Sequence, residues 1–371
     1  MIQAAVLEAL VTFLAMVSLV LVLRPLAARV GLVARPDQIR RHGVATPAVG
    51  GLGILLAVAG CLVASRFAAL ASDVTSYQMR GVALAALIIV AGGMIDDRFR
   101  LQWPYRLGVQ VLAALVLIHV GGIRVQNLGY VFGFHLGSLG RWSELLTVVA
   151  TVGIINAINM IDGVDGLAGS VSLVVVVMLT SVAIYAGNRL LAMDLGFVAG
   201  ALCGFLAFNL RTPWNRTASI FLGNAGADLL GLLIASACFR LTQNIHHPVG
   251  PQLAPFLLAP ALIDCLTLML RRLRSGRSPF EGDRNHLHHL LLDAGLTPSA
   301  VVVVLTGGTI AIGMTAMLAM KAHVAPLAFT LVFIMVWLGY FRATWRRDML
   351  VDRLRALAQG LGLAQAPVEP S

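Results

Sequence analysis

Long apolar runs separated by short polar connections dominate the sequence. A membrane-spanning helix needs about 20 mostly apolar residues, and eleven segments along the chain suit this role. The predicted spans cover residues 4–24, 48–65, 80–95, 107–122, 144–160, 168–187, 194–210, 224–240, 252–270, 299–320 and 324–341. The span at 80–95 is short and the span at 224–240 contains Asp228, so the pattern supports these two least. The pattern as a whole predicts an all-α polytopic membrane protein.

The composition leads to the same class. Hydrophobic residues make up 58% of the 371 residues, and charged residues only 12%. A soluble globular protein carries about 25% charged residues, so a soluble enzyme is excluded, and the apolar content excludes a disordered chain. We expect one integral membrane domain over residues 1–341 and a basic cytoplasmic tail over residues 342–371.

The distribution of basic residues predicts the orientation. Alternate connections hold 20 of the 27 Lys and Arg residues, and connections rich in these residues face the cytoplasm. The N-terminus is therefore expected outside and the C-terminus inside. Segment 123–142, on the outer side, has glycines and alternating apolar residues that predict a small extracytoplasmic hairpin. The net charge of +10 lies in connections between apolar runs, which favours anionic membrane lipid and a phosphorylated substrate as partners over nucleic acid.

A pair of acidic residues, Asp96 and Asp97, ends the third span. Adjacent carboxylates at a membrane border repel each other unless they share a cation or a proton. This pattern indicates a divalent-metal or proton-transfer site. The alternative is a solvated helix end whose charge is balanced by Arg98 and Arg100.

A second polar segment follows the fifth span. Asn156 and Asn159 are one helical turn apart, and Asp162 and Asp165 continue the same spacing among glycines. Polar side chains at the border of a span are costly and usually functional. A helix break at the end of a span would also produce this composition.

Two further candidates lie later in the chain. Asn224 opens the eighth span between glycines, where backbone N–H groups suit a phosphate or a metal ion, although an ordinary helix cap looks the same. The loop at 277–289 carries arginines, among them Arg284, and the three histidines His286, His288 and His289, whose side chains suit a diphosphate. No zinc-binding spacing accompanies these histidines.

A fifth cluster lies before the second span. It combines Arg40, Arg41 and His42 with the glycine-rich segment 46–53. The arginines have an alternative explanation as positive-inside charge, and the glycines as positions of close helix packing.

Taken in order, these segments resemble the polyprenyl-phosphate N-acetylhexosamine-1-phosphate transferase family. The resemblance runs from Pro47 to Leu296 and is carried by Asp96-Asp97-Arg98, NAINMIDGVDGLAGS, FLGNAG and DRNHLHH. The HLHH loop resembles the N-acetylglucosamine branch. The resemblance implies about 11 transmembrane helices around a cytoplasmic active-site cleft in a bacterial inner membrane. It also implies Mg²⁺ as the cofactor, with Mn²⁺ as an alternative, and leaves a homodimer open.

The implied reaction has two substrates, a UDP-N-acetylhexosamine and undecaprenyl phosphate. It transfers the sugar 1-phosphate to the lipid, releases UMP and initiates cell-envelope polysaccharide synthesis. The resemblance places Asp96 and Asp97 at the catalytic centre, with Asp96 as the base. It assigns Asp97, Asn159 and Asn224 to the metal, and assigns the nucleotide sugar to Arg106, Asn156, Asp162, Asp165, Arg284, His286 and His288.

One residue departs from the family pattern. Asn224 stands where the family usually has a metal-binding Asp, and a neutral amide is a weaker ligand for Mg²⁺ than a carboxylate. Asp228, one helical turn later, is a candidate compensating acid. The departure keeps a second interpretation open, a catalytically weakened homologue that binds the nucleotide sugar or the lipid carrier. A transporter is disfavoured because its polar residues would lie near the membrane midplane.

Overall fold

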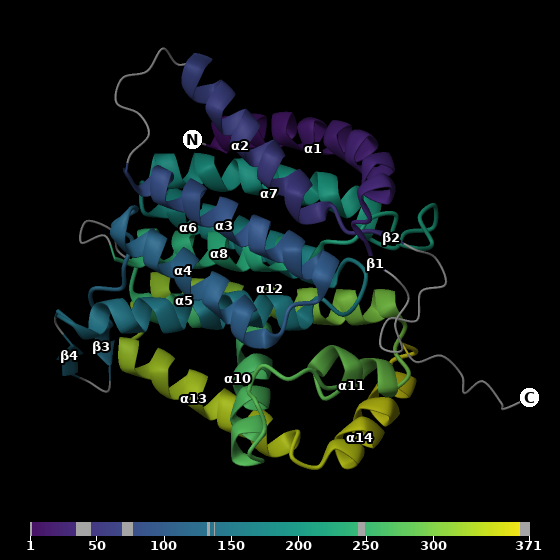
Figure 1. Cartoon of the computed structure of the whole chain (residues 1–371). Coiled ribbons are helices and arrows are strands. Elements are labelled where there is room, and N and C mark those ends of the chain that lie inside the picture. The colour runs from purple at the N-terminus through teal and green to yellow at the C-terminus, as the bar shows by residue number, and fades with distance from the viewer. Residues whose placement is uncertain are drawn as a thin grey trace, which may run out of the picture.

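The structure is a computed structural model that describes residues 2–34, 46–68, 77–131, 134–136, 138–243 and 249–363. Within these residues the chain is largely helical, and its long helices run side by side as a bundle (Figure 1). The helices are α1 (Ile2–Val30), α2 (Gly50–Ala68), α3 (Tyr77–Phe99), α4 (Trp103–His119), α5 (Trp142–Ile161), α6 (Leu167–Tyr185), α7 (Arg189–Asn209), α8 (Gly223–Thr242), α9 (Ala254–Leu257), α10 (Ala259–Arg274), α11 (Leu287–Asp293), α12 (Pro298–Lys321), α13 (Pro326–Ala343) and α14 (Arg347–Gly360).

Two short antiparallel hairpins lie at opposite ends of the bundle (Figure 1). One pairs β1 (Val33–Ala34) with β2 (Thr46–Pro47), and the other pairs β3 (Gly129–Val131) with β4 (Phe134–Leu136). The second pair confirms the hairpin predicted within 123–142. Arg40, Arg41 and His42 of the fifth sequence cluster lie outside the described residues.

The polytopic class is confirmed by the helices. In the described ranges, eight helices are long and apolar enough to cross a membrane, and α9 with α10 makes a ninth if that bent pair is one span. Two shorter apolar helices, Gly50–Ser65 and Trp103–His119, occupy the two remaining predicted spans. The two least supported segments form α3 and α8, and α8 is the most buried of the long apolar helices. The total of eleven spans and their orientation stay predictions.

The span predicted over 252–270 consists of two helical parts and is not one continuous helix. A 3₁₀ turn (Pro251–Leu253) and α9 precede α10, and the two parts meet at an angle of 86°. Pro260 lies in the first turn of α10, where its ring would clash with the carbonyl of Phe256 in a continuous helix. The break turns α10 across the direction of the other helices, next to α13 and α11 (Figure 1).

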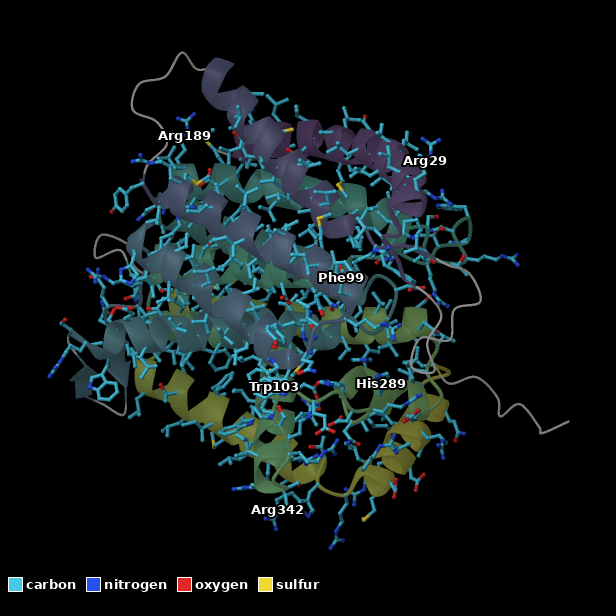
Figure 2. All side chains as sticks on the ribbon, in the orientation of Figure 1. Arg29, Phe99, Trp103, Arg189, His289 and Arg342 are labelled. Atoms are coloured by element: carbon cyan, nitrogen blue, oxygen red, sulfur yellow. The ribbon has the colours of Figure 1, made fainter. Side chains whose placement is uncertain are left out.

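The basic residues lie toward opposite ends of the bundle. Arg29 belongs to the arginine-rich set of connections and Arg189 to the poorer set, and Figure 2 places them at opposite ends. This agrees with the alternation on which the predicted orientation depends.

Close packing of α1 on α7 depends on a glycine every fourth residue. A Cβ atom on Gly200 would lie 2.1 Å from the carbonyl oxygen of Ala9, and one on Gly196 would lie 2.7 Å from that of Ala5. Gly204 packs in the same way on Met16. Small residues at this spacing let membrane helices approach closely, because apolar lipid provides no hydrophobic drive for their association.

Helix α8 is surrounded by the helices that carry the candidate site. A Cβ atom on Gly93 of α3 would lie 2.3 Å from the Cα of Ala225, and one on Gly231 would lie 2.5 Å from the Cα of Ile155 in α5. Gly51 of α2 meets the backbone of Gly226 equally closely. These contacts bring the polar ends of α3, α5 and α8 together.

We predict opposite effects for two glycine substitutions in spanning helices. Gly93→Ala should lower stability by about 1–3 kcal/mol because the added methyl group must push α3 away from α8. Gly153→Ala in α5, where a Cβ would meet nothing within 4 Å, should be neutral or mildly stabilising. Thermal unfolding of the two purified variants in one detergent measures the difference, and equal midpoints would contradict the close approach.

Candidate functional site

Asp96 closes the tight turn between α3 and α4 and faces the start of α8. Its Oδ1 accepts a hydrogen bond from the backbone N–H of Leu101 at 2.7 Å, and its Oδ2 accepts one from Asn224 Nδ2 at 2.8 Å. The guanidinium of Arg106 lies 3.9 Å from the same Oδ2. The carboxylate is buried, and through these three contacts it connects the end of α3 to α4 and to α8.

Asp97 points to the N-terminus of α8. Its two oxygens accept hydrogen bonds from the backbone N–H groups of Asn224 and Ala225 at 2.9 and 3.3 Å. The backbone of Gly223 has a φ of +73°, and a Cβ there would lie 2.6 Å from Asp97 Oδ2, so glycine is required. The sequence suggests that free backbone N–H groups at Asn224 suit a phosphate or a metal ion. In the structure, the N–H groups of Asn224 and Ala225 donate to Asp97 instead.

A network of side-chain amides joins α4, α5 and α8. Gln110 Nε2 donates to Asp228 Oδ2 at 3.1 Å, and Asn159 Nδ2 donates to Asp228 Oδ1 at 3.0 Å. Asn156 Nδ2 donates to Gln110 Oε1 at 2.7 Å, and Asn159 Nδ2 also lies 3.4 Å from Asn224 Oδ1. Asp228, the candidate compensating acid, is therefore connected to Asn224 through Asn159.

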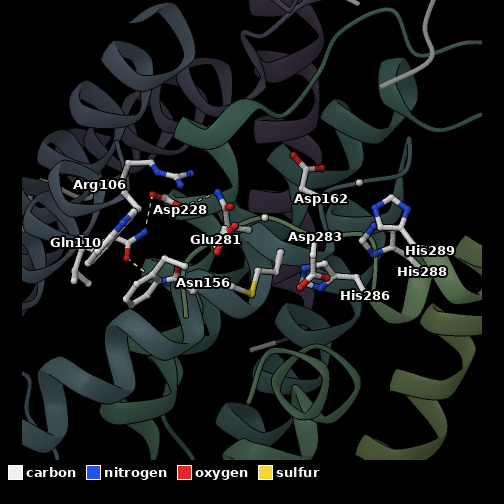
Figure 3. A pocket seen from close by; sticks show the side chains of 17 residues that line it. Arg106, Gln110, Asn156, Asp162, Asp228, Glu281, Asp283, His286, His288 and His289 are labelled. Carbon is white, nitrogen blue, oxygen red and sulfur yellow. Dashed lines mark hydrogen bonds between the residues drawn. The ribbon is translucent and has the colours of Figure 1, made fainter. Parts of the chain in front are cut away.

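Gln110, Asn156, Asn159 and Asp228 line a cavity of about 260 Å³, which Asn224 does not line. Figure 3 shows the amides, Arg106 and Asp228 on one side, the histidines on the other, and Asp162 and Asp283 between them. The polar side chains that line this cavity are those of Trp103, Arg106, Gln110, Asn156, Asn159, Asp162, Asp228, Glu281, Asp283, His286, His288 and His289. Trp103 stacks on Phe280, with ring centroids 5.4 Å apart, and so connects α4 to the loop before α11.

The loop between α10 and α11 is anchored by Arg272. This buried guanidinium donates to Asp283 Oδ2 at 2.9 Å and to the carbonyl of Pro279 at 2.8 Å. Burial alone would raise the pKa of Asp283, but its hydrogen bonds from Arg272 and the N–H of Asn285 outweigh burial and lower the pKa. Asp283 therefore stays a carboxylate at the cavity wall.

His286 is held on both ring nitrogens. Its Nδ1 lies 2.9 Å from Asp264 Oδ2, and its Nε2 lies 3.3 Å from Arg272 Nη2. A guanidinium can only donate and a carboxylate only accept, so Nδ1 carries the proton and Nε2 accepts. Asp264 also accepts hydrogen bonds from the N–H of Leu287 and from the hydroxyl of Tyr340 at 2.6 Å. The tautomer of His286 is thus set from α10 and α13.

His288 lies deeper, against Gly163 at the end of α5. A Cβ on Gly163 would lie 2.3 Å from His288 Nε2, so no other residue fits there without movement. Burial lowers the pKa of His288 well below its ordinary value, and the neighbouring His289 and His286 lower it further. The ring is therefore neutral at pH 7, and neither nitrogen hydrogen-bonds to a described residue.

Arg284 is placed outside the cavity wall. Its guanidinium is half exposed and lies 3.6 Å from Asp293 Oδ1. Asp293 also pairs with Arg347, and its carbonyl accepts a hydrogen bond from Arg355 at 3.0 Å. Part of the predicted basic tail thus forms α14, and Arg347 and Arg355 of this helix bind Asp293 of α11. The predicted phosphate-binding role of Arg284 stays a prediction.

Asp162 and Asp165 separate at the end of α5. Asp162 lines the cavity, whereas Asp165 is buried and its Oδ2 accepts a hydrogen bond from Arg211 Nε at 2.8 Å. Both border a second, much smaller cavity next to Asn209. Asp162 therefore lines the larger cavity and Asp165 does not, and the predicted nucleotide contact of both residues stays a prediction.

The site contains oxygen ligands suited to Mg²⁺. Among the described residues, no three His, Cys, Asp or Glu side chains form a metal-binding group. Mg²⁺ does not need such a cage, because it binds through one or two carboxylates together with water and substrate phosphates. Asp228, Asn159 and Asn224 supply one carboxylate and two amides within one hydrogen-bond network, so the donor set fits the ion.

Several residues of the site were not predicted from sequence. They are Trp103, Gln110, Asp264, Arg272, Asp283 and Tyr340. Gln110 offered the clearest signal, since it is a lone amide in the apolar run at 107–122, where polar residues are costly.

Comparison of the sequence with known proteins identifies relatives of this chain. The sequence model of glycosyl transferase family 4 matches residues 79–242. The undecaprenyl-phosphate alpha-N-acetylglucosaminyl 1-phosphate transferase of Pasteurella multocida is 36% identical over 307 residues, which cover 81% of this chain and 82% of the relative. Proteins of the same name from Haemophilus influenzae and Escherichia coli K12 are 32% and 30% identical, over 95% and 90% of this chain and 98% and 89% of their own lengths.

A polar cavity among the helix ends of a multi-pass bundle is typical of a membrane protein with a binding site between its helices. The extent of the similarity shows that the chain belongs to glycosyl transferase family 4, the polyprenyl-phosphate N-acetylhexosamine-1-phosphate transferases that its motifs resemble.

We predict that Tyr340→Phe destabilises the protein although α13 lies at the edge of the bundle. The substitution removes a hydrogen bond to the buried carboxylate of Asp264, and bonds to charged groups contribute about 1.5–3 kcal/mol. Tyr185→Phe, at a half-exposed tyrosine, is the matched control. Thermal unfolding in detergent measures both, and a Tyr340→Phe midpoint equal to that of the control would refute the link between α13 and His286.

Proposed function

We propose that this protein transfers N-acetylglucosamine 1-phosphate, or a related N-acetylhexosamine 1-phosphate, from its UDP-sugar to undecaprenyl phosphate. The products are undecaprenyl-diphosphate sugar and UMP, and the reaction initiates cell-envelope polysaccharide synthesis on the cytoplasmic face of a bacterial inner membrane. One observation carries the proposal: Arg106, Asp228 and three amides from α4 and α5 converge with the histidine loop on a single cavity.

The nucleotide sugar fits the polar walls of this cavity. Arg106 presents a partly exposed guanidinium that suits the diphosphate. Asn156 and Asp162 offer hydrogen-bonding groups for the sugar and the base. Arg272 and Asp264 do not contact the substrate in this proposal, because they hold His286 and Asp283 in place.

Bound Mg²⁺ would neutralise the charge that develops on the diphosphate. Asp228, Asn159 and Asn224 would hold the ion, since they meet at the cavity wall and behind it. Asp97 was also assigned to the metal, and in the structure its oxygens accept hydrogen bonds from the N-terminus of α8. Its contribution would then be to fix the position of Asn224.

The chemical step is a displacement at the β-phosphorus. An oxygen of the lipid phosphate forms the new bond, the bond to the oxygen that bridges the two phosphates breaks, and UMP leaves with that oxygen. Asp96 takes any proton from the attacking phosphate, because it is the acid beside Arg106. We favour direct attack over an aspartyl-phosphate, since a nucleophile must reach the phosphorus itself and neither Asp96 nor Asp97 lines the cavity. A base can instead receive the proton through one bridging water, which is compatible with Asp96 behind the cavity wall. Positioning and charge neutralisation then supply most of the rate.

A second candidate function rests on Asn224. A neutral residue beside the metal position would suit a homologue that binds the nucleotide sugar or the lipid carrier with little turnover. Release of UMP from UDP-N-acetylglucosamine by the purified protein, dependent on added undecaprenyl phosphate, distinguishes the enzyme from such a homologue.

We predict that Asp97→Asn lowers the rate of UMP release at least about 100-fold, the scale of losing one well-placed electrostatic group. An amide NH₂ would face a backbone N–H at the start of α8, and Asn224 would shift. The protein should still fold, because the side chain keeps its size. Asp348→Asn, at an almost fully exposed carboxylate of α14, is the control and should retain full activity. A rate for Asp97→Asn within twofold of the parent would contradict the assignment.

A Mg²⁺ titration of activity tests whether Asp228 compensates for Asn224. Asp228→Ala should be severely impaired, because it removes the carboxylate that accepts hydrogen bonds from Gln110 and Asn159. The double variant Asn224→Asp, Asp228→Ala should regain most activity, and Asn224→Asp alone should change the Mg²⁺ requirement little because a second acid adds repulsion. If Asp228→Ala titrates like the parent, compensation is wrong.

A further inference from the structure

Another cavity lies where α13 ends and α14 begins. It shares no lining residue with the cavity of the candidate active site. Its volume is about 980 Å³. Arg342, Arg346 and Arg353 line it together with Leu338, Trp345 and Met349. The cavity therefore combines three cations with an apolar wall.

The three arginines are not neutralised by the protein. All three are exposed, and among the described residues none of them pairs with a carboxylate. Their neighbours Arg347 and Arg355, in contrast, pair with Asp293 and Asp352. Guanidinium groups match phosphate oxygens with paired hydrogen bonds, so an anionic phosphate group is the ligand that this charge complements.

The position of the cavity favours a lipid over a soluble anion. Leu338 continues the exposed apolar face of α13, which includes Leu331 and Met335. Trp345 is 63% exposed beside the arginines, as is typical of tryptophans at the border between lipid tails and headgroups. A molecule with acyl chains along α13 and a phosphate at the arginines fits both walls.

Two further arginines stack on the aromatic rings that line this cavity. Arg271 lies over the rings of Phe341 and Trp345, at 5.1 and 5.8 Å from their centroids, and Arg274 lies over Phe341 at 5.2 Å. Arg271 also donates to the carbonyl of Phe341 and the hydroxyl of Thr344. These contacts hold the end of α13 in place and add positive charge behind the exposed arginines.

We propose that this cavity binds an anionic glycerophospholipid of the surrounding bilayer. The occupant is a bilayer phospholipid and not the undecaprenyl phosphate substrate, since the phosphate of the carrier must reach the separate active-site cavity. Juxtamembrane arginines attract anionic lipid additively, so three of them should give a clear preference over a zwitterionic lipid.

Native mass spectrometry of the full-length protein in detergent tests the proposal. Phosphatidylglycerol and phosphatidylcholine are titrated separately, and bound lipid is counted directly, without reference to activity. The pocket variant is Arg342→Gln, Arg346→Gln, Arg353→Gln. The matched control removes the same charge at the other end of the bundle through Arg124→Gln, Arg141→Gln and Arg189→Gln, all of which are exposed. The first two lie on either side of the hairpin of β3 and β4 (Figure 1), and Figure 2 labels Arg189.

The parent and the control should bind phosphatidylglycerol in preference to phosphatidylcholine, and the pocket variant should bind it at least about tenfold more weakly. A lysine triple variant at the same three positions should retain most of the preference, which separates lost charge from misfolding. Equal binding of the two lipids by the parent, or equal losses in the pocket and control variants, would overturn the proposal. So would displacement of phosphatidylglycerol by an equimolar amount of undecaprenyl phosphate, which would make the cavity a carrier site.

Discussion

Asp228 lies buried in a bundle of apolar helices, and two side-chain amides hold its carboxylate. A carboxylate in such surroundings is costly unless hydrogen bonds or a cation compensate its charge. Gln110 and Asn159 must therefore come from neighbouring helices, and α4, α5 and α8 must meet at one point. The same requirement applies at Asp96 and Asp264, where each carboxylate accepts N–H or O–H donors from at least two elements. The buried acids thus determine which helices are neighbours.

Glycines make these neighbourhoods possible. Gly51, Gly93 and Gly231 let α2, α3 and α5 approach α8 to distances at which any Cβ would collide with backbone atoms. The side chains of Asp96 and Asn224 then reach each other across the α3–α8 contact. Small residues therefore serve the chemistry indirectly, because they set the distance between the polar groups.

The spans, the hairpin and the order of the polar motifs could be predicted from sequence because each depends on local pattern. Asp96, Asn159 and Asp162 could be predicted because they are polar residues at the ends of apolar runs. The bend before α10 was missed, although Pro260 signals it, since hydrophobicity alone was continuous across 252–270. Tyr340 could not be found in this way: it acts on Asp264, 76 residues earlier, and only the turn of α10 across the bundle brings the two together.

The two buried acids Asp228 and Asp264 differ in where their donors lie along the chain. Gln110 and Asn159 precede Asp228, whereas His286, Leu287 and Tyr340 all follow Asp264. Because a ribosome delivers the N-terminal part first, the amide side of the cavity can assemble as soon as α8 enters the membrane. The carboxylate of Asp264 acquires its last donor only when α13 has been synthesised. The histidine side of the cavity is therefore completed last, and its maturation depends on the final spanning helix.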